Sequence, residues 1–516
     1  MILRPERFER GGEPAAPVVP RGSSPLSVDP TLLALASGSL VLYGCLFQLL
    51  RFRSLQFAKT FTLERWSWLR AFSDTLTPRG LAEAPPGTPL AAVNAVFYAL
   101  VVTLLVVFWV IALRRVRQPA GGAPLGWLLA ATVLFGIPLV CLPSMHSKDL
   151  YLFILYGREI ALRHANPFLV PPSAFPDDPY VGWTPNSVIP SSYGPLWLLL
   201  SGGLSVLAGG GMLENLVVYK SALLASHVAA TAILWSALRG TRREDAAWAA
   251  VFYGWNPLVL LETVGNGHSE GLMALCLAVA LWAAARRAWV ASALAVTGAC
   301  LVKPTALLFL PPLVLVWLRS LPSWRSRVRD LAWGLTGSAI CAAAIYAPLW
   351  AGGAWLDNAR RNSAAFAYQN SVWHWLAGAL SAGDAAATAW TQDILTPLRN
   401  AIFLLAFVAI LHRVYRGLSL ADSWAWVWFT YCLMLAWIWP WYLTLAIVAA
   451  AASVGRRSVA LAGGLTLGGL LFWLGWPEGH AVAPWLREYK WLLLFGPALV
   501  MAIAPPRLWP GRAGHG

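Results

Sequence analysis

The stretch AAVNAVFYALVVTLLVVFWVIAL, residues 91–113, contains no charged side chain and is followed directly by a basic run at residues 114–117. About 20 apolar residues in an α-helix cross the ~30 Å hydrocarbon core of a bilayer, and the helix satisfies its own backbone polar groups there. Arg and Lys accumulate in cytoplasmic loops. The stretch therefore predicts a transmembrane helix that ends on the cytoplasmic side.

The composition shows that this pattern extends along the chain. Of the 516 residues, 58% are hydrophobic and only 12% are charged. The net charge of +15 comes mostly from short basic runs beside apolar segments, which indicates cytoplasmic loops rather than a nucleic-acid-binding surface. The sequence predicts an all-α integral membrane protein whose partner is the lipid bilayer and not nucleic acid.

Apolar stretches of spanning length predict about 12–14 transmembrane helices, with both termini cytoplasmic. The single spans are expected at Thr31–Leu50, Ala91–Leu113, Pro124–Leu142, Asn215–Leu238, Ala246–Val264, Gly271–Ala285, Leu331–Trp350, Ile394–Leu411, Val459–Trp476 and Trp491–Ala504. Two longer stretches, Ala288–Leu318 and Trp424–Val454, are broken at Val302-Lys303-Pro304 and at Trp439–Tyr442. Both predict hairpins whose apex reaches the extracytoplasmic side.

These spans divide the chain into five regions. Residues 1–30 form a disordered cytoplasmic tail without a cleavable signal peptide, and residues 31–123 form an N-terminal transmembrane pair with its loops. Residues 124–350 form the membrane core, 351–505 a C-terminal transmembrane region, and 506–516 a second cytoplasmic tail. The short segment Tyr193–Gly210 is expected to lie on the outer face, because another crossing would place the Arg239–Arg243 run outside.

Irregular polar segments fall on one side of this predicted topology. They are Cys141–Trp197, Gly265–Gly271, Val302–Pro304, Trp350–Trp375 and Trp439–Tyr442. Functional polar groups are therefore expected to converge on the extracytoplasmic face. Interfacial helices are expected within the first of these segments.

Asp149 is the candidate catalytic residue of this loop. It precedes the apolar run 150–155, which can form an interfacial helix at the water boundary. A partly desolvated carboxylate has a raised pKa and can take a proton from a hydroxyl group. The alternative is an Asp that only favours a helix N-terminus.

Cations and polar groups nearby are candidates for binding an anionic substrate. Arg158, Arg163 and Lys303 can hold a phosphate, although interfacial anchoring of the arginines and outward extension of the lysine are open alternatives.

His268 and Glu270 occupy a tight polar turn, where helix capping is the alternative role. Trp441 and Tyr442 can stack on a sugar or belong to an aromatic belt. Sugar or acceptor binding is also assigned to Tyr151, Asn166 and Tyr193, whereas Asp177 and Asp178 are expected to be solvated.

The order of these motifs resembles a known family. SKDLYLF (147–153), NPF (166–168), SSYGPLW (191–197), NPLVLLETVGNGHSEGLM (256–273), LVKPTALLFLPPLVLVWL (301–318) and WPWY (439–442) follow one another. This set is similar to the polyprenol-phosphate-mannose-dependent α-(1→6)-mannosyltransferases of the GT-C superfamily. The resemblance covers roughly Met145–Leu318, and the rest of the chain agrees only in hydropathy.

The resemblance implies a GT-C-like helical bundle and places the family's catalytic base on Asp149. The family's His-Asn-Glu turn falls on His268-Ser269-Glu270, with Ser269 departing from the pattern, and its Val-Lys segment falls on Val302-Lys303. It further implies an inverting transfer of a sugar, expected to be mannose, from a polyprenyl-phosphate donor to a glycan or lipid acceptor. The expected location is the extracytoplasmic face of a cell inner membrane.

Other functions remain open at this point. A transporter or flippase of lipid-linked sugars would need polar groups reachable from both sides, and a scaffold of envelope assembly would tolerate loss of Asp149. No nucleotide-binding, zinc-protease or serine-hydrolase motif stands in a suitable context. No metal or cofactor is required by a ligand pattern, but Asp149 and Glu270 can share a divalent cation.

Overall fold

The computed structural model describes residues 28–51, 89–118, 123–142, 144, 146–240, 243–365, 369–381, 384–453, 455–475 and 488–505. Within these ranges the chain forms helices and no β-strand, with isolated bridges joining Gln369 and Asn370 to Trp437. The predicted all-α membrane fold is confirmed. The two predicted tails lie outside the described ranges, apart from residues 28–30.

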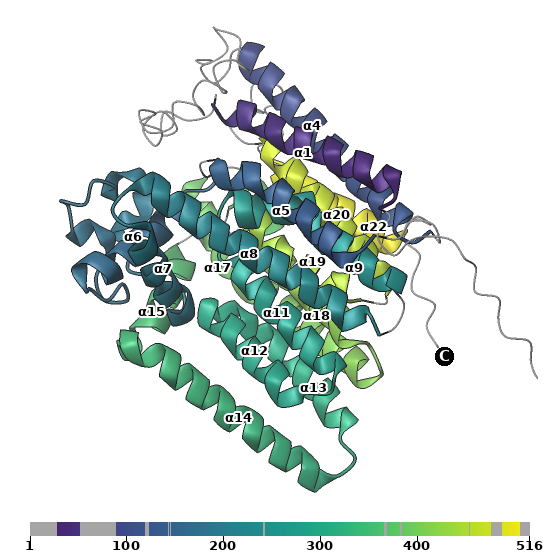
Figure 1. Ribbon diagram of the computed structural model, residues 1–516. Coiled ribbons are helices and arrows are strands. Elements are labelled where there is room, and N and C mark those ends of the chain that lie inside the picture. Colours follow the sequence, from purple (N-terminus) through teal and green to yellow (C-terminus); the bar gives the residue numbers. More distant parts are fainter. Residues whose placement is uncertain are drawn as a thin grey trace, which may run out of the picture.

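Figure 1 shows the arrangement of the helices. In chain order they are α1 (Pro30–Arg51), α4 (Pro89–Arg115), α5 (Leu125–Cys141), α6 (Asp149–Arg163), η1 (Pro172–Ala174), η2 (Val181–Trp183), η3 (Pro185–Val188), α7 (Pro195–Ala208), α8 (Met212–Leu238), α9 (Arg243–Gly254), α10 (Pro257–Val259), η4 (Leu260–Gly265), α11 (Glu270–Ala285), α12 (Trp289–Val302), η5 (Pro304–Phe309), α13 (Leu310–Ser320), α14 (Trp324–Tyr346), η6 (Ala347–Leu349), α15 (Ala354–Ala365), α16 (Val372–Ser381), α17 (Ala385–Tyr415), α18 (Leu420–Met434), η7 (Pro440–Leu443), α19 (Thr444–Ala451), α20 (Arg456–Phe472), η8 (Trp473–Gly475) and α22 (Lys490–Ile503). Their bounds agree with most of the predicted spans.

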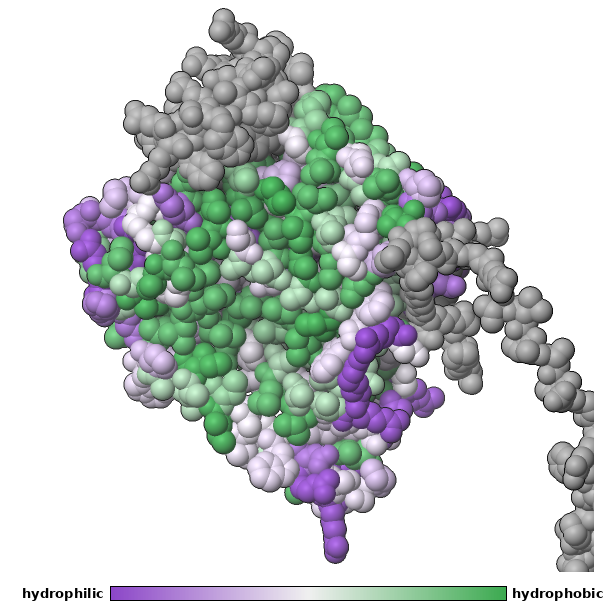
Figure 2. All heavy atoms as spheres, in the orientation of Figure 1, coloured by the Kyte–Doolittle hydropathy of each residue, from purple (hydrophilic) through white to green (hydrophobic). Residues whose placement is uncertain are grey.

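Four helical segments among the described residues are long and apolar enough to cross a membrane: Val96–Arg115, Met212–Leu238, Trp324–Leu349 and Trp390–Tyr415. Several shorter apolar helices accompany them. Large apolar side chains of α14 and α17 face outward, with Leu335 and Leu405 each 71% exposed. Figure 2 shows apolar surface over the middle of the visible face and hydrophilic residues gathered toward its left and lower right edges. Such an exposed apolar surface requires lipid around it.

The two predicted hairpin apices are breaks in the structure. Helix α12 ends at Val302 and η5 begins at Pro304, so Lys303 stands between two helices in extended conformation. Helix α18 ends at Met434, and η7 begins at Pro440 within the WPWY motif. Proline has no backbone N–H group to donate to a preceding helical turn. This explains why each new helical segment starts at a proline.

The predicted single span Ala246–Val264 is wrong as one continuous helix. Helix α9 ends at Gly254. Asn256 then caps the next helical segment, α10, by accepting a hydrogen bond from the Val259 backbone nitrogen (3.1 Å). The Asn256 side chain also donates to Thr466 Oγ1 of α20 (2.9 Å). The segment that follows, η4, is a π-helix. Such irregular turns are frequent at functional sites, and this one carries the buried Glu262.

Candidate functional site

A cavity of about 680 Å³ lies where these breaks meet the start of α6. The residues that line it lie within the ranges 146–156, 185–193, 303–305, 359–362 and 431–442, together with Arg399. Four of the five polar segments expected to converge therefore line one cavity. The fifth, Gly265–Gly271, contributes His268, which stacks on the cavity residue Trp441.

Asp149 is the first residue of α6 and lines this cavity. Its backbone nitrogen donates to Ser147 Oγ (3.1 Å), and the hydroxyl group of Tyr193 donates to its Oδ2 (3.4 Å). Because Ser147 supplies the acceptor at this helix end, the half-buried carboxylate of Asp149 is left to face the cavity. Burial raises the pKa of Asp149 above its ordinary value, against the opposing effect of the nearby His268 and Lys303 charges.

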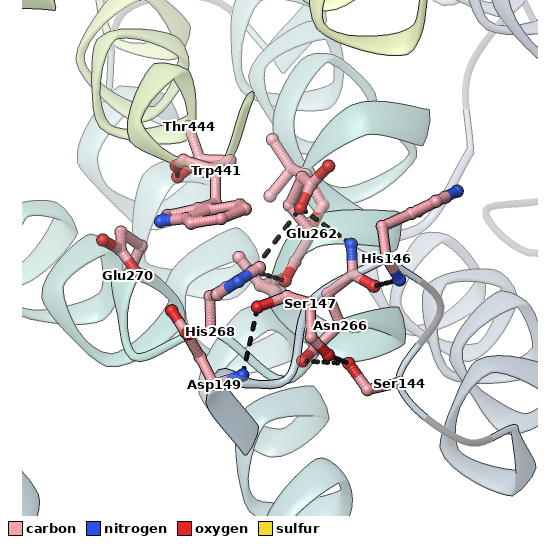
Figure 3. A network of polar contacts seen from close by, with 12 residues as sticks. Ser144, His146, Ser147, Asp149, Glu262, Asn266, His268, Glu270, Trp441 and Thr444 are labelled. Atoms are coloured by element: carbon pink, nitrogen blue, oxygen red, sulfur yellow. Dashed lines mark hydrogen bonds and ion pairs between the residues drawn. The ribbon is translucent and has the colours of Figure 1, made fainter. Parts of the chain in front are cut away.

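The turn after η4 places His268 beside Asp149. Figure 3 shows the His268 ring stacked against Trp441, with Asp149 and Glu262 on either side of it in this view. The ring centroids of His268 and Trp441 are 4.0 Å apart. Gly267 makes the turn possible, since its φ of +76° is rare for any residue with a side chain.

Lys303, which is partly exposed, forms an ion pair with the buried Glu270 at the cavity wall. Its Nζ lies 2.8 Å from Glu270 Oε1, and the side chains are 16% and 2% exposed. The ammonium group also lies 4.4 Å from the centre of the Tyr442 ring, a cation–π distance. Burial opposes the charge of Lys303, but the Glu270 carboxylate outweighs it and raises the pKa of the lysine. Lys303 therefore remains a cation within the site.

Gly194 joins the loop of Tyr193 to the end of α12. Its backbone nitrogen donates to Val302 O (2.8 Å), and a Cβ atom at this position would lie 2.0 Å from Leu301 O. The SSYGPLW motif thus needs glycine here for close approach of two backbones. The neighbouring side chains also approach each other, with Lys303 Nζ 5.6 Å from the centre of the Tyr193 ring.

We expect Gly194→Ala to lower stability by about 1–3 kcal/mol, because backbone atoms must move apart to admit the methyl group. Thermal unfolding in detergent should show a lower midpoint than the parent protein. Gly203→Ala is the matched control, since a Cβ there meets no atom within 4 Å and Gly203 lies inside helix α7. Equal midpoints for Gly194→Ala and the parent would contradict the expected contact.

Four predicted substrate-binding residues that do not line the cavity contact other parts of the outer loop and its surroundings. Arg158 pairs with Asp178 (2.8 Å), and both are buried, so the expectation that Asp178 is solvated is wrong. Arg163 pairs with Asp177 at the surface. Asn166 donates to Leu349 O (3.0 Å), and Tyr151 lies 5.6 Å from the Trp183 ring. The structure thus assigns the two arginines partners within the outer loop, and phosphate binding by them stays a prediction.

Sequence reasoning missed several charged residues of this region, among them Glu262, Lys220 and Arg399. Glu262 is fully buried behind His268, and Lys220 is fully buried in α8, where its Nζ donates to Leu139 O (3.1 Å) and to Leu142 O at the end of α5. Arg399 lines the main cavity from α17. A charged residue inside an apolar run is the signal that identifies Glu262 and Lys220, because such residues need a partner within the membrane.

The fold and this cavity define the class: an all-α, multi-pass membrane protein with an acid–base cluster where its helices break. Residues 65–319 match the family described as alpha-(1->6)-mannopyranosyltransferase, N-terminal domain. Residues 218–444 also match the family of the GPI transamidase subunit PIG-U.

Curated relatives point to the first of these families. Alpha-(1->6)-mannopyranosyltransferase A of Mycobacterium tuberculosis is 31% identical over 227 residues, which are 43% of this chain and 42% of that protein. The protein of the same name from Corynebacterium glutamicum is 25% identical over 299 residues, 50% of this chain and 57% of that protein. The matches thus span about half the length of these relatives. The chain is a relative of the alpha-(1->6)-mannopyranosyltransferases, and the resemblance predicted from its motifs is confirmed.

Proposed function

We propose that the protein is an integral-membrane glycosyltransferase that moves mannose from a polyprenyl-phosphate donor to an acceptor hydroxyl group. The observation that carries the proposal is the position of Asp149, a carboxylate that lines a cavity of about 680 Å³ together with Lys303 and Trp441. The sugar follows from the names of the relatives. The acceptor is the hydroxyl group of a glycan or of a lipid.

The chemistry of this transfer needs one base and several cations. The bond between the anomeric carbon and the phosphate oxygen breaks, a new bond to the acceptor oxygen forms, and the acceptor proton passes to Asp149. The phosphate leaves as an anion and needs no proton. Lys303, Arg360 and Arg399 line the same cavity and supply positive charge for it. One displacement of this kind inverts the anomeric configuration.

A second cavity supports a lipid-linked donor. Its volume is about 440 Å³, and it shares Pro304, Thr305, Arg399, Tyr431 and Leu435 with the first cavity. The remaining lining is mainly apolar: Leu307, Leu308, Asn400, Phe403 and Met434. Leu307 is 54% exposed, so this groove opens on the apolar outer surface. A polyprenyl chain in the groove would place its phosphate near Arg399, beside the polar cavity.

The proposed location is the inner membrane, with the site on its extracytoplasmic face and both termini in the cytoplasm. Helix α11 runs from Glu270 to the Arg286-Arg287 pair, and α12 runs back from there to Lys303. The site and the basic pair therefore lie at opposite ends of these helices. Because basic residues favour the cytoplasmic side, the opposite end faces outward.

The test is sugar transfer in membranes that contain the protein. Membranes receive radiolabelled polyprenyl-phosphate-mannose or polyprenyl-phosphate-glucose and a crude envelope acceptor fraction, with and without EDTA. We expect label in the acceptor from the mannose donor only, releasable by an α-mannosidase. We also expect it with EDTA, because Lys303 already neutralises the Glu270 carboxylate that a cation shared with Asp149 would need. Movement of intact donor across vesicles without transfer would favour the transporter instead.

A further inference from the structure

Glu262 is a buried carboxylate beside the site that the proposed reaction does not use directly. It is 0% exposed and lies in the π-helix η4. Trp473 Nε1 donates to its Oε1 (2.7 Å), and Asn266 Nδ2 donates to its Oε2 (2.9 Å). Burying an ionised carboxylate costs free energy even when neutral donors surround it. A cation next to Glu262 would account for its place.

His268 is that neighbour, and its orientation is fixed. Its Nδ1 lies 2.9 Å from the Glu262 carbonyl oxygen and 3.4 Å from Oε2 of the same residue. A carbonyl oxygen only accepts, so Nδ1 carries a hydrogen atom. Nε2 is buried without a hydrogen-bond partner among the described residues. Stacking on Trp441 holds the plane of the ring.

The charges around His268 favour its protonated form. Burial opposes protonation, but Glu262, Asp149 and Glu270 together outweigh it and raise the pKa of the imidazole. These carboxylates come from three elements, η4, α6 and α11, and Glu262 is the one in contact with the ring. In turn, the His268 charge lowers the pKa of Asp149 against the effect of burial.

The titratable groups around Asp149 also include one further cation, one carboxylate and two tyrosines. Lys303, from the break after α12, lowers the pKa of Asp149, and Glu270 raises it. Tyr193 donates a hydrogen bond to Asp149, and Tyr156 lines the same cavity from α6. Lys303 is already paired with Glu270. Of the two cations, His268 has the larger effect on the pKa of Asp149.

We propose that Glu262 is a positioning residue that acts through His268: it holds the imidazole in one orientation and charged, and the imidazolium keeps the base Asp149 ionised. This inference rests on the proposed function, in which Asp149 must be ionised to accept the acceptor proton. We call this series of alternating charges, Glu262, His268 and Asp149, the relay. The same carboxylate also holds the segment before Asp149 in place. It accepts a hydrogen bond from Asn266, which in turn accepts one from the His146 backbone nitrogen (2.9 Å).

The test is the pH dependence of kcat/KM for sugar transfer by Glu262→Gln. Without the carboxylate, His268 loses its proton at lower pH, and Asp149 then titrates with Lys303 as its remaining neighbouring cation. The acid limb of the profile should move to higher pH by about 1 unit. A purely structural role would lower kcat/KM by the same factor at every pH and leave the limb in place, and that result would overturn the proposal.

Two further variants make the test specific. His268→Gln should reproduce the shift of the acid limb, and Glu262→Gln should add no further upward shift in that background, because each change removes the positive charge of the imidazolium near Asp149. Glu262→Asp, which keeps the charge, should retain the parental limb. If Glu262→Gln does not accumulate in membranes, His268→Gln alone decides, and an unshifted limb contradicts the relay.

Glu159→Gln is the control for replacing a buried acid by its amide without a change of charge, since burial raises the pKa of Glu159 to about 8. Glu159 is 3% exposed in α6 and is not among the residues that line the cavity. The acid limb of the kcat/KM profile of Glu159→Gln should coincide with that of the parent protein. Absence of transfer by the parent would contradict the proposed function, whereas transfer with an unshifted Glu262→Gln profile would contradict only the relay.

Discussion

Asp149→Asn is expected to reduce mannose transfer by about 10²–10⁴-fold, the usual range for loss of a general base. The amide has the shape of the carboxylate and can still accept the hydrogen bond from Tyr193, so the cavity should persist. It cannot accept the proton of an attacking hydroxyl group. The measurement is kcat/KM for transfer in membranes with equal amounts of parent and variant protein.

The pH profile of the parent protein provides a second view of the same group. Because burial raises the pKa of Asp149, its basic form is lost as the pH falls through a value above the ordinary one for aspartate. Transfer should therefore decline at a pH where exposed aspartates remain ionised. Equal transfer by Asp149→Asn and the parent protein would remove Asp149 from catalysis and favour a role at the helix end.

The sequence predicts the fold well because hydropathy controls it. Most predicted spans agree with helices in the described ranges, such as α4, α5, α8 and α11. The breaks at Lys303 and at the WPWY motif were also predicted, since proline and polar residues interrupt apolar runs there. The predicted convergence of the polar segments agrees with the cavity that Asp149 and Lys303 both line.

The partners of charged residues were harder to predict. Arg158 pairs with Asp178 through an irregular loop of short 3₁₀ turns, which has no periodicity from which its path can be derived. Glu262 lies in a run that hydropathy assigns to one continuous span, whereas the capping by Asn256 and the π-helix depend on tertiary contacts with α20. Local pattern therefore predicts where polar residues gather, and packing decides which of them pair.

Lys303→Gln is the second change with a large expected effect, because it leaves the Glu270 carboxylate buried without its cation. Removing one partner of a buried ion pair costs about 3–5 kcal/mol. We expect a lower midpoint of thermal unfolding in detergent. Loss of a charge that stabilises the departing phosphate should also reduce transfer by about 10²–10³-fold.

The double variant Lys303→Gln/Glu270→Gln separates these two effects. Two amides can hydrogen-bond where the ion pair stood, so stability should largely return, while transfer should stay low because no cation replaces Lys303. The matched control is Arg158→Gln/Asp178→Asn, which neutralises a buried pair outside the cavity and should retain transfer. Recovery of both stability and transfer in the Lys303/Glu270 double variant would show that the lysine serves only to neutralise Glu270. Loss of transfer in the control would instead support the predicted role of Arg158 in holding phosphate.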